Sequence, residues 1–228
     1  MIIAIDGTSG SGKSTLAKTL AKKLNFGFFS AGSLYRTITL KALNLHIKDT
    51  EDDKLHYMIE HTEIIYSYDG AKNTMLLDGI DVADMLHNEE ISSNVAKYAC
   101  KPYIREYVRK LQRDTQNHNK NIVMEGRDIG SVIFPNADMK IYVDCSVETR
   151  AKRRFKEYAE KDPNVTYEQV LADLKDRDYK DMHREISPLI MCENAFLIDS
   201  SLNTADECVT LALDEMVRRG LITKDQIQ

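Results

Sequence analysis

Residues 7–14 read Gly7-Thr8-Ser9-Gly10-Ser11-Gly12-Lys13-Ser14, which fits the pattern G-x4-G-K-[ST] without a mismatch. An apolar run from Ile2 to Ile5 precedes this stretch, and leucines follow it at a four-residue interval: Leu16, Leu20 and Leu24. These patterns predict a buried strand before the stretch and an amphipathic helix after it. That order of strand, glycine-rich turn and helix is the context that a phosphate-binding loop requires.

The residue types of this loop suit a nucleoside triphosphate. Glycines let the backbone curl so that successive N–H groups point at one anion, and the following helix directs its positive dipole end at the same phosphates. Lys13 adds a full charge for the β- and γ-phosphate oxygens, and the Ser14 hydroxyl can ligate Mg²⁺. A plain strand-to-helix turn would explain neither Lys13 nor the spacing. We therefore predict a metal ligand at Ser14 and ATP binding by Gly7, Thr8, Ser9, Gly10, Ser11, Gly12, Lys13, Ser14 and Thr15.

The composition is that of an ordinary folded chain with no overall attraction for polyanions. Of the 228 residues, 43% are hydrophobic and 29% are charged, and the formal net charge is -5. This negative net charge disfavours binding to an anionic membrane. It also disfavours binding to RNA through the arginines of residues 150–154. The four cysteines form no CxxC pair, which argues against zinc and is typical of reduced thiols. No apolar stretch approaches a membrane span, so we expect a cytoplasmic protein with no membrane or nucleic-acid partner.

Five short apolar runs predict the strands of one sheet. They are Ile2 to Ile5, Phe26 to Phe29 closing at Ser30-Ala31-Gly32, Ile122 to Met124, Met139 to Val143, and Phe196 to Ile198. Helical composition lies between them, notably in residues 92–116, interrupted only by Pro102, and in the highly charged residues 148–184. Strands that alternate with helices predict an α/β fold, with a five-stranded parallel sheet and helices on both faces.

Two insertions in this core are the candidate moving parts. The runs Glu63 to Tyr68 and Thr74 to Leu77, separated by Asp69-Gly70, predict a small antiparallel β patch. We expect a single domain over 1–228 that carries a β-rich insert and a helical lid. Its core would be 1–58, 92–154 and 186–228, its insert about 59–91, and its lid about 155–185.

The rest of the chain distinguishes among the classes of protein that carry such a loop. A GTP-dependent switch needs an Asn-Lys-x-Asp motif, and residues 119–122 lack its aspartate; the signature of transport ATPases is also absent. Arginines occur instead at several separated places, which suits phosphoryl transfer because that reaction depends on positioning and charge stabilisation. Arginines on a charged helix are otherwise solvated surface, but a three- and four-residue spacing puts one set on a common face: Arg150, Arg153 and Arg154. These features favour a small kinase.

Several segments resemble those of the bacterial cytidylate kinase family and together extend over almost the whole chain. They are the loop at 7–15, Gly32 to Arg36, Pro102 to Glu106, Glu125 to Gly130 with Phe134-Pro135, and Arg177-Asp178 through Asp181 and Arg184 to Leu189. The resemblance implies the P-loop nucleoside monophosphate kinase fold, in which the β-rich insert binds the monophosphate and the charged helical region is the lid. It also implies ATP-dependent, in-line phosphorylation of CMP and dCMP. We expect these nucleotides as the small-molecule partners of a monomer.

The resemblance further implies roles for individual residues. Arg36 and Arg184 would hold the monophosphate. Arg177 and Asp181 would hold the ribose, and Arg105 and Asp128 would face the cytosine. Arg150, Arg153 and Arg154 would reach the transferred phosphoryl group, and with Lys13 and Arg127 they make up the catalytic set. The roles suit the residue types, because guanidinium groups pair with phosphate oxygens and a carboxylate accepts from the cytosine N4 amine.

Several positions depart from the family pattern. Ser30-Ala31-Gly32 stands where Asp-Ser-Gly or Asp-Thr-Gly is usual, Ala96 replaces a serine near the base, and Glu125 and Lys180 replace an aspartate and an arginine. These changes leave ATP use untouched and leave the strength of the CMP preference open. One alternative is a kinase of the same fold that acts on UMP, another nucleotide or a small metabolite. Another is an ATP-binding regulator without catalysis.

Overall fold

The computed structural model of the chain describes residues 1–68, 73–118, 120–160 and 162–228 and forms two compact units. The first unit comprises Met1–Phe26 and Val123–Gln228, and the second comprises Gly27–Ile122. Within the described ranges, no helix combines the length and the apolar character needed to span a membrane.

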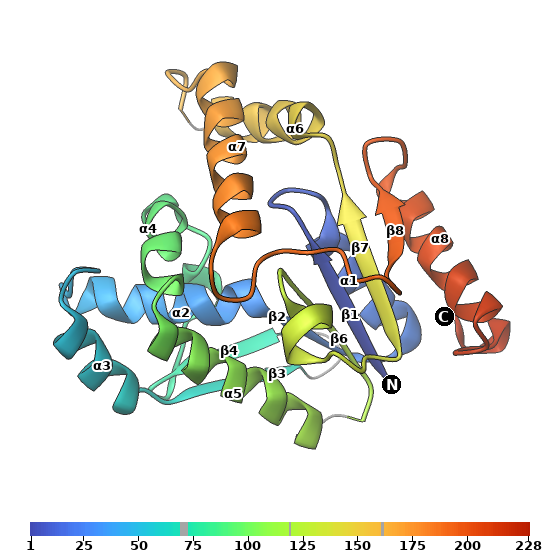
Figure 1. Cartoon of the computed structure of the whole chain (residues 1–228), viewed down its shortest axis with the longest axis horizontal. Coiled ribbons are helices and arrows are strands. Elements are labelled where there is room, and N and C mark those ends of the chain that lie inside the picture. The colour runs from blue at the N-terminus through green and yellow to red at the C-terminus, as the bar shows by residue number, and fades with distance from the viewer. Residues whose placement is uncertain (69–72, 119, 161) are drawn as a thin grey trace. The chain divides into compact units, whose positions relative to one another are not determined.

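A five-stranded sheet confirms the main element of the predicted fold (Figure 1). β1 pairs in parallel with β7, with Ile3 opposite Met139, and β7 pairs in parallel with β8. The strand order β2-β6-β1-β7-β8 reverses around β1, and open α/β sheets bind ligands beyond the carboxyl ends of the strands at such a point. The strands are β1 (Ile2–Gly7), β2 (Gly27–Ser30), β6 (Ile122–Gly126), β7 (Met139–Asp144) and β8 (Phe196–Asp199).

Two helices of the first unit pack together beside the five-stranded sheet. α1 (Lys13–Leu24) contacts both β1 and α8 (Ala205–Arg218), and α8 contacts β8. The apolar stripe predicted for α1 is buried: Leu16, Leu20 and Leu24. Thr204 caps the start of α8 with its hydroxyl, and a short 3-10 turn, η3 (Lys224–Gln226), follows that helix.

A single π-helical turn, η2 (Ile129–Ile133), follows β6 and contacts β1. The sequence gives no sign of it, because five residues are too few to show a helical period. Such turns occur frequently at functional sites.

Two further helices, α6 (Val147–Ala159) and α7 (Tyr167–His183), form a helical pair in the first unit (Figure 1). They pack through a small apolar cluster that contains Ala151, Val170 and Leu174. The predicted helical region 148–184 is therefore two helices. The break between them includes Asp162-Pro163-Asn164, residue types that favour turns.

The second unit forms around an apolar core of its own. Its fully buried side chains include Ile38, Leu55, Met75, Ile91 and Ile104. Its helices are α2 (Ala31–Asn44), α3 (Asp52–Glu60), α4 (Glu89–Ala99) and α5 (Pro102–His118), with a 3-10 turn η1 (Ala83–Met85). A three-stranded sheet has the order β3 (Ile64–Tyr68), β4 (Asn73–Leu77) and β5 (Ile80–Asp81).

The small sheet and the helix break at Pro102 confirm two predictions made from the sequence. β3 pairs antiparallel with β4, with Ile64 opposite Leu77. The predicted turn at Asp69-Gly70 lies outside the described residues. α4 ends before Pro102 and α5 begins at it, because proline has no N–H to donate within a helix but suits the first helical position.

One predicted boundary is wrong. The sequence places Ala31 and Gly32 in the turn that closes the second strand, but both belong to the first turn of α2. Ser30 lies at the N-cap position of that helix with an extended backbone (φ -108, ψ 115), and serine is among the residues preferred there. The strand therefore passes directly into the helix without a separate loop.

Candidate active site

The predicted phosphate-binding loop connects the end of β1 to the start of α1. Gly7 is required at the beginning of the turn, since a Cβ there would lie 2.2 Å from the carbonyl oxygen of Val143. Thr8 and Ser11 are buried, and neither hydroxyl has a hydrogen-bond partner among the described residues. Buried hydroxyls without partners are costly, so the loop fits a ligand that presents several oxygen atoms. The exposed residues in the first turn of α1 are Ser14 and Thr15.

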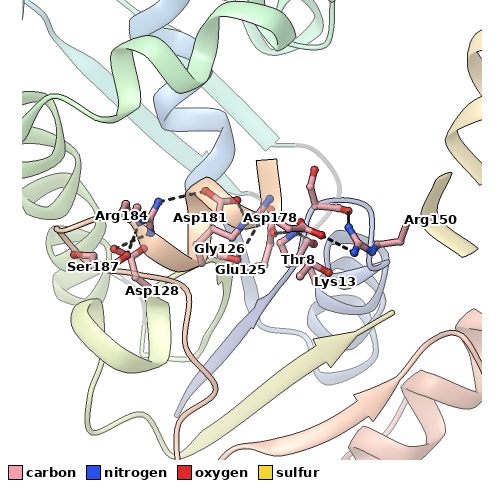
Figure 2. Close-up of polar contacts among 12 residues, drawn as sticks. Thr8, Lys13, Glu125, Gly126, Asp128, Arg150, Asp178, Asp181, Arg184 and Ser187 are labelled. Carbon is pink, nitrogen blue, oxygen red and sulfur yellow. Dashed lines mark hydrogen bonds and ion pairs between the residues drawn. The ribbon is translucent and has the colours of Figure 1, made fainter. Parts of the chain in front are cut away.

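Lys13 is buried at the start of α1 beneath this loop. Its Nζ donates to the carbonyl oxygen of Thr8 at 3.1 Å and lies 3.9 Å from Oε2 of Glu125 (Figure 2). Burial lowers the pKa of Lys13 to about 7, and the neighbouring charges of Arg127 and Arg177 act in the same direction, against Glu125 and Asp181. The neutral amine of Lys13 is therefore poised to gain a proton when a polyanion approaches.

We expect ATP binding to take up a proton above neutral pH. With a pKa of about 7, only about a tenth of the free protein carries the Lys13 charge at pH 8. Since ATP favours the charged form, the dissociation constant for ATP should rise roughly fivefold from pH 7 to pH 8 and nearly tenfold per unit above that. Titration calorimetry in buffers of different ionisation enthalpy measures the uptake. Lys13→Ala should abolish it, and its absence in the wild type would contradict the lowered pKa.

Arg150 links the loop to both α6 and α7. Its Nη1 donates to the carbonyl oxygen of Ser9 at 3.0 Å, and its Nε donates to that of Cys145 at 2.9 Å. Its Nη2 donates to Oδ2 of Asp178 at 2.6 Å, in an ion pair whose side chains are 4% and 12% exposed (Figure 2). The guanidinium is thus hydrogen-bonded to three protein acceptors. Its removal would leave the carboxylate of Asp178 buried without its ion-pair partner.

The other two arginines of α6 have different surroundings. Arg154 Nη2 donates to Oγ of Ser9 at 3.3 Å, so it lies beside the loop as Arg150 does. Arg153 Nη2 donates instead to the carbonyl oxygen of Ser200 at 2.7 Å, just after β8. The structure therefore brings Arg150 and Arg154 to the phosphate-binding loop and directs Arg153 to the neighbouring strand end.

Arg127, directly after β6, forms a partly buried ion pair with Asp181 of α7. Its Nε donates to Oδ2 of Asp181 at 2.9 Å. Burial opposes ionisation of this carboxyl, but the charge and the hydrogen bond of Arg127 outweigh it and lower the pKa of Asp181. Both groups are therefore charged at neutral pH.

Asp128 and Arg184 lie near Asp181 (Figure 2). Arg184 Nη2 lies 3.9 Å from Oδ2 of Asp128, and its Nη1 lies 3.6 Å from Oδ1 of Asp181. Its Nε donates to the carbonyl oxygen of Ser187 at 2.6 Å. Asp128 is 4% exposed, so its carboxylate is shielded from water. Arg177 also belongs to this region, because its charge lowers the pKa of both Lys13 and Asp181.

The remaining predicted residues, Arg36 and Arg105, lie in the second unit. Arg36 Nη1 donates to Oγ of Ser92 at 2.8 Å and to the carbonyl oxygen of Leu86 at 3.1 Å. Arg105 is 3% exposed and donates to the carbonyl oxygen of Ala99, with its guanidinium carbon 5.8 Å from the centre of the Tyr35 ring. That distance suits a cation–π contact.

Comparison with known proteins now assigns the family. The sequence pattern of the family described as "Cytidylate kinase" matches residues 3–218. This chain belongs to the cytidylate kinase family. The cytidylate kinase of Caldicellulosiruptor saccharolyticus is 40% identical over 93% of each chain, and cytidylate kinase 1 of Haemophilus influenzae is 36% identical over 97% of this chain and 95% of its own. A crystal structure of an uncharacterized protein from Eubacterium ventriosum, 14% identical, covers 95% of this chain and 98% of its own with a TM-score of 0.53, which supports the fold alone.

Within this member of the cytidylate kinase family, sequence reasoning missed two polar residues that hold predicted site residues. Asp178 accepts from Arg150, and Ser92 accepts from Arg36. Asp178 stands next to Arg177 in a segment that resembles the family, and its place about one turn before Asp181 on α7 was a usable signal. Ser92 lies close to Ala96, where the family has a serine near the base, but nothing in the sequence indicates its contact with Arg36, 56 residues away.

Proposed function

We propose that the protein catalyses the ATP-dependent phosphorylation of CMP, and of dCMP, to the diphosphate. The match of residues 3–218 to the cytidylate kinase family carries this proposal. The phosphate-binding loop supports it independently, because its buried hydroxyls and its buried Lys13 suit a triphosphate donor. The cytoplasmic location and the monomeric state stay predictions from the sequence.

In the proposed reaction, an oxygen of the CMP phosphate attacks the γ-phosphorus of ATP in line, and the bond to the β,γ-bridging oxygen breaks. Backbone N–H groups of residues 7–15 cradle the phosphates, and Lys13 offsets the negative charge that gathers on them. The hydroxyl of Ser14, exposed at the start of α1, suits Mg²⁺, which would supply further charge neutralisation when bound with ATP. Arg127 and Arg154 contribute positive charge from β6 and α6. No covalent enzyme intermediate is required.

Six residues would hold the acceptor, as the family resemblance implies. Arg36 and Arg184 bind its phosphate, Arg177 and Asp181 its ribose, and Arg105 and Asp128 its base. The ion pairs of Arg184 with Asp128 and Asp181 support this proposal, because they hold the planar guanidinium in one orientation. The contact of Arg36 with Ser92 does the same in the second unit.

Loss of either phosphate-binding arginine should act on the acceptor alone. We expect Arg36→Ala and Arg184→Ala each to raise the dissociation constant for CMP by about tenfold or more, since charge-assisted hydrogen bonds are lost. Affinity for ATP should change by less than about twofold. Arg113→Ala, at an exposed position of α5, is the matched control. Equal weakening of both nucleotides would argue against a separate acceptor site.

The helical pair α6 and α7 contains most of the proposed lid, residues 155–185. We expect its backbone hydrogen exchange to slow only when both nucleotides, or a bisubstrate mimic, are bound, because closure excludes water from the reacting groups. Hydrogen-exchange mass spectrometry measures this by segment, with α8 as the internal reference. If hydrogen exchange in 155–185 is the same with and without ligands, this segment is not a lid.

An acceptor panel tests the proposed function against its alternatives. ADP release is measured with ATP alone and with CMP, dCMP, UMP, AMP, GMP and small hydroxylated metabolites. The proposal predicts the highest kcat/KM with CMP or dCMP. A regulator would release no acceptor-dependent ADP, and a kinase of another specificity would prefer another member of the panel.

A further inference from the structure

A buried carboxylate at the end of β1 has no role in the reaction as proposed above. Asp6 is 5% exposed and immediately precedes Gly7, the first residue of the phosphate-binding loop. The burial of a carboxylate is unfavourable in itself. Its presence therefore calls for a compensating role.

Both oxygens of Asp6 accept backbone hydrogen bonds from η2. Oδ1 accepts from the N–H of Ile129 at 2.8 Å, and Oδ2 accepts from that of Gly130 at 2.7 Å. These are the first two residues of the π-helical turn, so the carboxylate serves as its N-terminal cap from 123 residues away in the sequence. Only a carboxylate offers two equivalent acceptors without a competing donor.

The residue that these contacts fix is Asp128, which directly precedes Ile129. The carbonyl oxygen of Asp128 also accepts hydrogen bonds within the turn, from the N–H groups of Val132 at 2.9 Å and Ile133 at 3.1 Å. The backbone of Asp128 is thus held by the turn that it begins, and Asp6 holds the start of that turn. The direction of the Asp128 side chain depends on this anchoring.

The space around the contact is tight. A Cβ added at Gly130 would lie 3.4 Å from Oδ2 of Asp6 and 3.2 Å from Cδ of Lys140. A larger residue at position 130 would therefore press on the carboxylate and on the lysine stem at the same time. A side chain at position 130 therefore needs the lysine stem to shift by a few tenths of an ångström beside the Asp6 contact.

The charge state of Asp6 is compatible with this contact at neutral pH. Burial raises the pKa of Asp6 to about 6, the two N–H groups oppose that effect, and the nearby charges of Asp128 and Arg127 raise and lower it respectively. Asp6 is therefore largely ionised at pH 7 and above, and both hydrogen bonds are charge-assisted.

We propose that Asp6 is a positioning residue that directs Asp128 toward the acceptor base and ties that base reader to the start of the phosphate-binding loop. This role rests on the proposed CMP kinase function. It explains why a buried carboxylate is tolerated beside a phosphate site: the same residue aligns the donor loop with the acceptor base through two hydrogen bonds.

Asp6→Asn tests the role, because it keeps the size of the side chain but turns an NH₂ group toward one of the two N–H donors. We expect KM for CMP to rise by about tenfold and the CMP-to-UMP ratio of kcat/KM to fall, since the base reader is misdirected. KM for ATP should stay within about twofold, since the loop keeps its own contacts. A merely structural role would lower the amount of active enzyme and leave both KM values and the base ratio unchanged.

Asp138→Asn is the matched control. Oδ2 of Asp138 accepts from the N–H of Ile2 at 2.7 Å, so this variant removes the charge from the same kind of contact at the opposite, exposed end of β1. It should change neither KM value. Gly130→Ala disturbs the Asp6 contact from the other side and should raise KM for CMP in the same direction, which keeps the proposal testable if Asp6→Asn fails to fold.

The outcomes separate this proposal from the function on which it rests. If the wild type does not phosphorylate CMP, the proposed function fails before any variant is compared. If the wild type is active but neither Asp6→Asn nor Gly130→Ala shifts KM for CMP or the base ratio, the positioning role is overturned and the function stands. Equal increases in KM for ATP and CMP would also overturn it, because they would assign Asp6 to the phosphate-binding loop alone.

Discussion

Lys13→Ala should reduce phosphoryl transfer by about a thousandfold or more while the protein stays folded. The ammonium is the full positive charge of the loop, and its loss removes stabilisation of charge that develops on the transferred group. The fold should tolerate the change, because burial already lowers the pKa of Lys13 to about 7 and the charged form is disfavoured in the free protein. Steady-state ADP formation with saturating CMP measures the loss, and thermal unfolding measures the stability.

The matched control for this prediction is Lys22→Ala, at an exposed position in the last turn of the same helix. It should keep wild-type turnover. Near-normal activity of Lys13→Ala would show that the loop does not bind the donor phosphates. A large drop in unfolding temperature would instead show that Lys13 is needed for the fold, against the expectation from its lowered pKa.

Asp128→Asn should shift the preference of the enzyme from CMP toward UMP. Cytosine presents an N4 amine donor where uracil presents an O4 acceptor, so an ionised Asp128 accepts from the first and repels the second. Asparagine keeps the size but supplies a donor for O4. The expected change in the ratio of kcat/KM values corresponds to about 1–3 kcal/mol, the range for one good contact to a base edge.

The surroundings of Asp128 sharpen this prediction. Its carboxylate is buried and lies 3.9 Å from Arg184, so the variant also weakens an ion pair on the proposed phosphate side. Some loss of activity toward both bases is therefore expected along with the shift. Asp173→Asn, at an exposed position of α7, is the control and should leave the ratio unchanged. A parallel fall for CMP and UMP would mean that Asp128 serves only the local turn.

The fold was largely predictable because its signals are local. The loop at 7–14 carries its own strand and helix in the flanking apolar pattern, and the later strands are short apolar runs bounded by turn residues. The boundary between β2 and α2 at Ala31 was not predictable, because a strand that passes directly into a helix leaves no turn residues to mark the change. The π-helical turn after Asp128 was not predictable either, because five residues are too few to show a helical period of hydrophobic residues.

Within the candidate site, residue types were easier to predict than their partners. The spacing of Arg150, Arg153 and Arg154 indicates a common helix face, but not that Arg153 reaches Ser200 while the other two reach Ser9. The contact of Asp6 with η2 joins positions 123 and 124 residues apart, and no sequence period reports such a contact. Long-range pairing depends on tertiary packing, which a single sequence does not display.

The pKa of Lys13 likewise depends on packing. Its type and position in the motif indicate a positive charge for the phosphates. Its burial, and its nearness to the charges of Arg127 and Arg177, come from the way β6 and α7 fold against the loop. The sequence alone therefore predicts the role of Lys13 but not its readiness to bind a proton with ATP.

Transfer of the γ-phosphoryl group of ATP to the phosphate of CMP is tested most directly by phosphorus NMR of a mixture of ATP, Mg²⁺, CMP and the purified protein. We expect ADP and CDP to appear in equal amounts and no inorganic phosphate to be released. An equal concentration of UMP in the same tube should be consumed more slowly. Hydrolysis of ATP to ADP and phosphate while CMP stays intact would contradict the proposed function, as would faster conversion of UMP.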